Sequence, residues 1–108
     1  MVRTQRNAWI HLAASVIVVV VGFWLALPAR DWTAIVLAMT LVWTAELINT
    51  ALEAVIDLAS PQYNHLAEIG KNVGAAAVLI AAFGSVWIGL LILGPPLWQR
   101  LQGWLAIP

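Results

Sequence analysis

The sequence has no cysteine and very little charge. Of its 108 residues, five are Lys or Arg and five are Asp or Glu, so charged residues make up only 9%. The lack of cysteine excludes disulfides and thiolate metal sites. A net charge of zero leaves no basic patch that could neutralise the phosphates of a nucleic acid, so we expect no nucleic-acid partner. Soluble domains usually carry about a quarter charged residues, so this balance excludes an ordinary soluble protein.

What is present instead is apolar: hydrophobic residues make up 63% of the chain. Three apolar segments, about 10–27, 32–58 and 71–93, are each long enough to cross a hydrocarbon core of about 30 Å as a helix. We therefore expect a single-domain, all-α integral membrane protein with three transmembrane helices. The first segment follows two arginines and could also be a secretory signal. The two later apolar segments, and the lack of a small-x-small cleavage site, favour a membrane helix.

Polar connections separate these segments. Pro28-Ala29-Arg30-Asp31 predicts a tight turn, with Trp32 behind it as an interfacial anchor. Residues 59–70 form the longest connection, and Pro61 breaks it because proline cannot continue a helix. The third helix could begin as early as Leu66 and is expected to end at Gly94-Pro95-Pro96.

The tail, residues 94–108, carries its apolar residues on one helical face: Leu97, Trp98, Leu101, Trp104 and Leu105. This pattern predicts a short helix that lies in the membrane interface. An unstructured tail anchored by its tryptophans is the alternative.

The basic residues predict the orientation. Arg3, Arg6 and Lys71 flank one side of the expected membrane, and Arg30 and Arg100 flank the other. Positive charge favours the cytoplasm, so we expect the amino terminus and the 59–70 connection to be cytoplasmic.

One stretch of the second helix stands out because it is acidic. Glu46, Asn49, Glu53 and Asp57 are spaced i, i+3, i+7 and i+11, so they share one helical face, which we call the acidic stripe. Counted from Trp32, Glu46 lies roughly 21 Å along the helix axis and Glu53 roughly 31 Å. Glu46 is therefore expected inside the lipid and Glu53 at the headgroup boundary. Ionisable residues at membrane depth are costly and tend to be functional.

The acidic stripe has the parts of a phosphoryl-transfer site. A carboxylate at the boundary, such as Glu53, can hold Mg²⁺, and one just inside the lipid, such as Glu46, can take a proton from a hydroxyl. Lys71 is placed to meet phosphate charge, and Asn49 can orient a hydroxyl or a carboxylate. Phosphoryl transfer depends on such positioning and charge neutralisation.

Less specific interpretations also fit the stripe. Glu46 and Asn49 could only join helices by hydrogen bonds, and Glu53 and Asp57 could be solvated charges. A small ion-coupled or drug-efflux protein could use Glu46 as its membrane acid. Such proteins usually have four helices and have no use for the cytoplasmic end of the stripe. His11 is interpreted as an interfacial residue at the start of the first helix.

Several motifs resemble the prokaryotic diacylglycerol kinase / undecaprenol kinase family. The resemblance covers roughly residues 5–93 and is carried by the run Ala45–Asp57, by Ser60-Pro61-x-Tyr63, by Lys71-Asn72-x-Gly74-Ala75-Ala76-Ala77 and by Arg6-Asn7-x-x-Ile10-His11. It implies a homotrimer in the bacterial plasma membrane with active sites shared between subunits at the cytoplasmic face. It also implies transfer of the γ-phosphate of Mg-ATP to the hydroxyl of a membrane lipid, undecaprenol or diacylglycerol. The residues of Ser60–Tyr63 and Leu47–Thr50 are more similar to those of the undecaprenol kinase branch.

The resemblance also implies residue roles. Glu46 matches the general base of the family and Glu53 its metal ligand, and Glu53, Asn49, Lys71 and Asn72 fall in the substrate- and ATP-binding set. Gln5 matches a second metal-binding position.

Two positions depart from the family pattern. Gln5 stands where a glutamate usually helps to hold the metal, and Asn72 stands where an aspartate usually follows the lysine. A glutamine offers only a neutral oxygen, so metal affinity is expected to be weaker. The alternative function is therefore a catalytically weak or inactive member that acts as a membrane-embedded binding or structural oligomer.

Overall fold

The computed structural model describes the backbone of residues 2–106 and the side chains of residues 8–106. Within this range the chain forms three helices and no strand: α1 (Val2–Trp24), α2 (Ala29–Ala59) and α3 (His65–Leu105). The expectation of an all-α protein is confirmed for these residues. The molecule is elongated, with principal extents of 65 × 26 × 18 Å.

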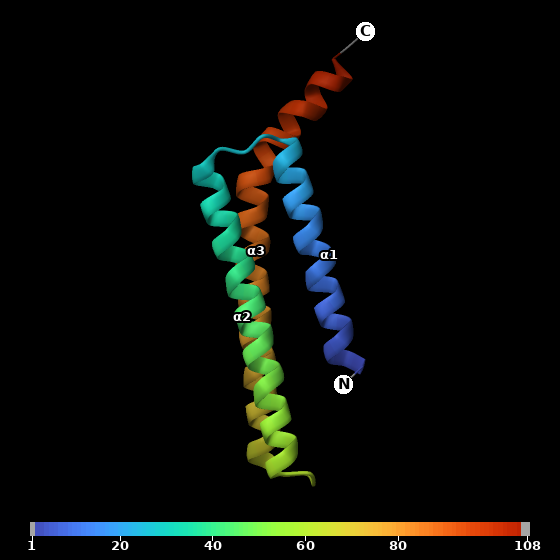
Figure 1. The fold of residues 1–108 in the computed structure, drawn as a ribbon, viewed down its shortest axis with the longest axis vertical. Coiled ribbons are helices and arrows are strands. Elements are labelled where there is room, and N and C mark those ends of the chain that lie inside the picture. The colour runs from blue at the N-terminus through green and yellow to red at the C-terminus, as the bar shows by residue number, and fades with distance from the viewer. Residues whose placement is uncertain (1, 107–108) are drawn as a thin grey trace.

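The helices run antiparallel in chain order. Helices α2 and α3 lie side by side and make most of the contacts between elements, and the shorter α1 packs more loosely beside them (Figure 1). The start of α1 and the α2–α3 connection lie toward one end of the bundle. The α1–α2 connection lies toward the other end (Figure 1). The beginning of α1 and the beginning of α3, which carries Lys71, therefore lie toward the same end of the bundle (Figure 1). The distribution of basic residues predicts the same arrangement.

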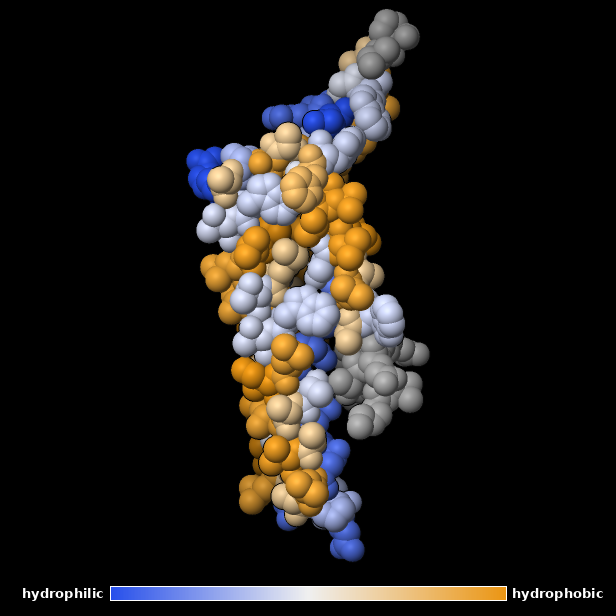
Figure 2. Space-filling model, in the orientation of Figure 1, coloured by the Kyte–Doolittle hydropathy of each residue, from blue (hydrophilic) through white to orange (hydrophobic). Residues whose placement is uncertain are grey.

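Two helices, α2 and α3, are long and apolar enough to cross a membrane, and α1 contains a shorter apolar stretch, Ala8–Trp24. Large apolar side chains on all three helices are exposed. Figure 2 shows them over much of the visible face, with hydrophilic side chains toward both ends. Such an apolar surface suits lipid rather than water. The molecule is thus a membrane protein, and the crossing by α1 stays a prediction.

Helix α1 ends at Trp24, before the expected end at Leu27, because the chain turns through a Schellman motif. The Leu27 N–H donates to the Gly22 carbonyl (3.2 Å), and the Ala26 N–H donates to the Phe23 carbonyl (3.1 Å). Ala26 has a φ of 54°, the left-handed conformation usually taken by glycine at this position. Pro28 also disfavours helical geometry at the residue before it.

Helix α3 begins at His65 because Asn64 caps it. The Asn64 side chain accepts hydrogen bonds from the N–H groups of Leu66 (2.9 Å) and Ala67 (3.4 Å). Asparagine is among the strongest N-cap residues, since its oxygen satisfies N–H groups that the helix leaves unpaired. The helix therefore begins earlier than residue 71.

The expectation that Gly94-Pro95-Pro96 ends the third helix is wrong. Helix α3 continues through both prolines to Leu105, so residues 94–105 belong to α3 and are neither a separate helix nor unstructured. Proline removes a backbone hydrogen bond and kinks a helix, and Figure 1 shows the last segment leaning away from the bundle. That segment is held to the end of α1, because Trp104 packs edge-on against Trp24 (5.7 Å between centroids) and the Arg100 guanidinium lies 4.9 Å from the Trp24 ring. Its placement in the membrane interface stays a prediction.

A narrow core joins α2 to α3 and leads directly to the acidic stripe. The buried residues of α2 recur every three or four positions: Ile35, Ala38, Val42 and Glu46. From α3, Gly74 and Val78 are buried, and the Ser85 hydroxyl donates to the Ala38 carbonyl (3.1 Å). Among the residues whose burial is described, Glu46 is the one buried charged side chain. The same periodicity that buries apolar residues therefore buries this carboxylate.

Candidate active site

Glu46 lies between α1 and α2. Its Oε2 atom is 3.4 Å from Nε2 of His11, which is within ion-pair distance. In the described part of the chain, Oε2 is buried and has no hydrogen-bond partner, so the two groups are close without ideal hydrogen-bond geometry. Burying a carboxylate without full hydrogen bonding is costly. The sequence predicts a submerged Glu46, and the structure places it out of solvent.

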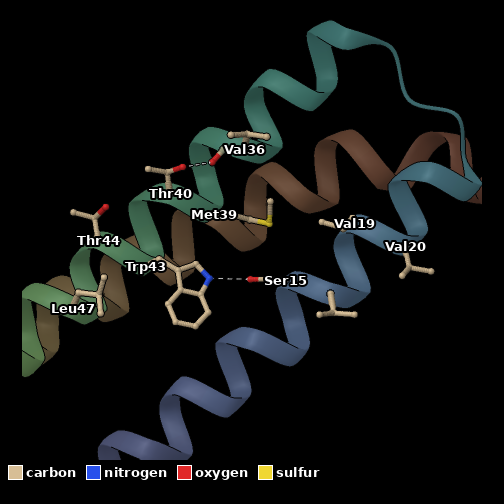
Figure 3. A pocket seen from close by; sticks show the side chains of 10 residues that line it. Ser15, Val19, Val20, Val36, Met39, Thr40, Trp43, Thr44 and Leu47 are labelled. Atoms are coloured by element: carbon tan, nitrogen blue, oxygen red, sulfur yellow. Dashed lines mark hydrogen bonds between the residues drawn. The ribbon is translucent and has the colours of Figure 1, made fainter.

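The His11 ring is held by a second contact between the same helices. It packs edge-on against Trp43, with 6.1 Å between centroids and 63° between planes. The Trp43 Nε1–H donates to the Ser15 hydroxyl (3.1 Å), and that hydroxyl donates to the His11 carbonyl (2.8 Å). Figure 3 shows the Trp43–Ser15 hydrogen bond spanning the two helices. Aromatic pairs of this kind add about 0.5–1.5 kcal/mol beyond simple burial, so the contact fixes α1 at the level of Glu46.

Asn49 lies one turn further along α2 and faces α3. Its Nδ2 atom donates to Glu53 Oε1 at 3.4 Å, a long hydrogen bond that links the middle of the stripe. Its Oδ1 atom is buried, without a partner among the described residues. The same oxygen rests against Gly74, where a Cβ atom would overlap it. Glycine is therefore needed at residue 74 if Asn49 is to keep this position.

Asp57 and Lys71 form the outer end of the site. Lys71 Nζ lies 2.5 Å from Asp57 Oδ1, and the two side chains are 44% and 64% exposed. An ion pair this exposed contributes about 0–1 kcal/mol, so Lys71 can leave Asp57 for another anion at little cost. Asn72, the next residue, is exposed. Of the predicted site residues, Glu46, Asn49, Glu53 and Lys71 thus lie along one side of the α2–α3 hairpin.

The metal-binding expectation concerns Glu53 and Gln5. The Gln5 side chain lies outside the described side chains, so its place relative to Glu53 stays a prediction. Among the described residues, no three His, Cys, Asp or Glu side chains form a cluster that could hold a metal ion by themselves. A half-buried carboxylate such as Glu53 nevertheless fits Mg²⁺, which usually takes one or two carboxylates and completes its shell with phosphates and water.

An apolar groove of about 550 Å³ runs between α1 and α2 (Figure 3). It is open to the molecular surface and has mostly apolar walls, formed by Ser15, Val16, Val19, Val20, Val36, Met39, Thr40, Trp43, Thr44 and Leu47. Trp43 and Leu47 lie within one turn of Glu46 on α2. An apolar chain in this groove would have one end near the buried carboxylate.

The α2–α3 connection carries one perturbed group. A hydrogen bond to the Glu68 carboxylate raises the pKa of the Tyr63 phenol, since the carboxylate accepts from the neutral form. Tyr63 is exposed, so the effect concerns only this pair.

Comparison with known proteins shows the family of the chain. Residues 1–93 match the family described as prokaryotic diacylglycerol kinase. Undecaprenol kinase from Bacillus subtilis (strain 168) is 39% identical over 95 residues, which is 88% of this chain and 77% of that protein. Diacylglycerol kinase from Escherichia coli (strain K12) is 36% identical over 95 residues, 80% of this chain and 78% of that protein. Diacylglycerol kinase from Synechocystis sp. is 44% identical over 95 residues, 87% of this chain and 54% of that protein.

The chain therefore belongs to the prokaryotic diacylglycerol kinase family, a family of ATP-dependent lipid kinases. The match ends at residue 93, so the last part of α3 lies beyond it.

Two residues of the site were given no role from sequence. His11 is interpreted as interfacial from the sequence, and Gly74 appears only as part of the Lys71-Asn72-x-Gly74 motif. Helical spacing within α2 could not pair His11 with Glu46, because that contact depends on how α1 crosses α2. The sequence signal that points to His11 is an ionisable side chain at the edge of the first apolar segment.

Proposed function

We propose that this protein transfers the γ-phosphate of Mg-ATP to the hydroxyl of a membrane lipid alcohol, undecaprenol or diacylglycerol, at the cytoplasmic face. The observation that carries the proposal is the buried Glu46 carboxylate, within one turn of Trp43 and Leu47, which line an apolar groove. A general base for a lipid hydroxyl has to lie where the lipid lies. A solvated carboxylate would not meet this condition, and Glu46 does.

The reaction needs little covalent chemistry from the protein. Glu46 takes the proton of the lipid hydroxyl as the lipid oxygen bonds to the γ-phosphorus of ATP. The bond from that phosphorus to the oxygen bridging the β-phosphate breaks, and ADP leaves with the electron pair. Removal of a proton by a positioned side chain is worth about 10²–10⁴ in rate. Asn49 holds Glu53, and Glu53 with Lys71 defines the polar side from which the nucleotide approaches.

Charge at the outer end supports binding of Mg-ATP. Lys71 is exposed and weakly held by Asp57, so its ammonium can pair with phosphate. Glu53, with Gln5 as the second expected donor, would hold Mg²⁺, which neutralises phosphate charge when it is bound. Asn72 remains a neutral hydrogen-bonding neighbour of Lys71.

We also propose that the active form is a homotrimer in the bacterial plasma membrane with its amino terminus in the cytoplasm. The support is the family resemblance together with the excess of basic residues on the side of the α1 start and Lys71. The relatives named above carry both lipid names, so their names do not separate undecaprenol from diacylglycerol.

The test is lipid phosphorylation by purified protein in lipid bilayers with ATP and Mg²⁺. We expect phosphate to appear on undecaprenol, diacylglycerol or both, and we expect Glu46→Gln to abolish it. A wild-type protein that is folded and oligomeric yet phosphorylates neither lipid would overturn the proposal. It would leave the non-catalytic alternative.

A further inference from the structure

We propose that His11 is a positioning residue for Glu46 and accepts the proton that Glu46 takes from the lipid hydroxyl. The inference rests on the proposed kinase function and adds a role for α1. No side chain of α1 beyond residue 7 other than His11 is ionisable, and it lies 3.4 Å from the buried carboxylate.

The different exposures of Glu46 and His11 indicate the direction in which the proton moves. The Glu46 side chain is 5% exposed, whereas the His11 side chain is 17% exposed. The Glu46 Oε2 atom is buried, and the imidazole beside it is the more exposed group, so the imidazole is the nearer way out for a proton on that oxygen. A general base that acts repeatedly has to lose its proton between turnovers, so Glu46 requires such a neighbour.

The surroundings of His11 hold the ring in place for this role. Trp43 packs edge-on against the ring, and Trp43 is itself fixed by its hydrogen bond to Ser15. Ser15 in turn donates to the His11 carbonyl. The ring of His11 is thus positioned by a residue of α2, the helix that carries Glu46, and Ser15 links that residue to the α1 backbone.

No other described ionisable group competes for the ring. On α2, Glu53 accepts a hydrogen bond from Asn49, and Asp57 pairs with Lys71 of α3. The buried residues that α3 places in the core, Gly74 and Val78, are uncharged. Glu46 is the one acid at ion-pair distance from His11 among the described side chains.

The proton step balances without another reactant. The neutral imidazole accepts the proton from the Glu46 carboxyl at Nε2, which leaves a carboxylate beside an imidazolium. The imidazolium then releases the proton to water, and both groups return to their starting states.

The chain offers a matched control because it has two histidines, and His65 lies in an exposed position at the start of α3. We would compare His11→Gln, His11→Phe and His65→Gln in the lipid-phosphorylation assay. Glutamine keeps a hydrogen-bonding group but cannot relay a proton, and phenylalanine keeps the ring contact with Trp43 without any nitrogen. Helical content and oligomer size are measured for each variant.

Both His11 variants should lower kcat about 100-fold, the lower end of what a general acid or base contributes, with KM for ATP unchanged. The pH profile of their remaining activity should differ from that of wild type, because no imidazole is left to take the proton from Glu46. His65→Gln should match wild type in both readouts.

A folded His11 variant with wild-type kcat, or one that is slow but keeps the wild-type pH profile, would overturn the inference. Because His11→Phe preserves the packing, it tests the role even if His11→Gln does not fold. If wild type is active and Glu46→Gln is not, failure of the His11 result affects this inference alone. A wild type that transfers no phosphate overturns the proposed function and this inference together.

Discussion

At the inner end of the acidic stripe Glu46 is buried against His11 of α1, whereas at the outer end Asp57 is open to solvent and pairs with Lys71 of α3. Both ends consist of a carboxylate and a nitrogen group from another helix. The inner pair is held by packing, through Trp43 and Ser15, and the outer pair is held only by charge. The inner end is therefore suited to a fixed proton transfer, and the outer end to exchange of ligands such as nucleotide phosphates.

Asn49 stands between the two ends and depends on Gly74. Gly74→Ala would place a methyl group against Asn49 Oδ1, so Asn49 and its hydrogen bond to Glu53 have to shift. We expect the free energy of unfolding to fall by about 1–3 kcal/mol because of overpacking. We also expect a larger loss of activity than from the changes at Lys71, Asn72 or Gly84, which are also in α3. Activity and the unfolding midpoint measure the two effects.

Gly84→Ala is the matched control, because a Cβ atom at Gly84 meets nothing within 4 Å. It should leave activity unchanged. Equal loss of activity in both alanine variants would contradict a specific role for the Gly74–Asn49 contact.

Removing the positive charge of Lys71 at the outer end of the stripe should weaken nucleotide binding and leave the proton transfer unchanged. Lys71→Gln should raise KM for ATP about tenfold, the equivalent of one charge-assisted hydrogen bond, with a smaller change in kcat. Asp57→Asn should leave KM for ATP unchanged or lower it, because it frees Lys71 from its exposed partner. Steady-state kinetics at fixed lipid concentration measures both. A wild-type KM in Lys71→Gln would show that the nucleotide does not bind at this end.

The two departures from the family pattern can be reversed. Gln5→Glu should lower the Mg²⁺ concentration for half-maximal activity by about 3–10-fold, since affinity grows with the number of charged ligands. Adding Asn72→Asp should change the maximum rate little, as expected for a site that already works with other ligands. A large gain in rate from a nearly inactive wild type would instead favour the weak or inactive alternative.

A change far from the stripe gives the smallest effect. Ala26→Gly should raise the free energy of unfolding by about 0.5–1 kcal/mol, because glycine adopts the positive φ of this turn without steric strain. Activity and KM for ATP should not change, since neither end of the stripe is touched. Thermal unfolding in lipid bicelles measures the gain. A loss of stability would show that the Ala26 side chain makes a contact worth more than the strain.

The sequence predicted the elements of the fold better than their ends. Long apolar segments indicated the helices because a membrane requires such lengths. The end of α1 and the start of α3 were displaced by local hydrogen bonds at Ala26 and Asn64, which outweigh the positions of the prolines. The continuation of α3 through Pro95 and Pro96 could not be predicted, since it accompanies packing of Trp104 and Arg100 onto Trp24 of another helix.

The candidate site likewise combines features that the sequence of one helix predicts with features that depend on contacts between helices. Residues on one helix, from Glu46 to Asp57, were placed on one face by spacing alone. The partners from other helices depend on crossing geometry, which no spacing within one helix contains. This is why the contact of His11 with Glu46 and the need for glycine at residue 74 emerged only from the structure.

We thus propose that the inner end of the acidic stripe transfers the proton and that the outer end binds the nucleotide. The most direct measurement is ATP binding and phosphoryl transfer for Glu46→Gln and Glu53→Gln side by side, in bilayers with Mg²⁺. We predict that Glu46→Gln binds ATP like wild type and transfers no phosphate, whereas Glu53→Gln needs more Mg²⁺ and binds Mg-ATP more weakly. Weakened ATP binding in Glu46→Gln, with normal binding in Glu53→Gln, would contradict the account.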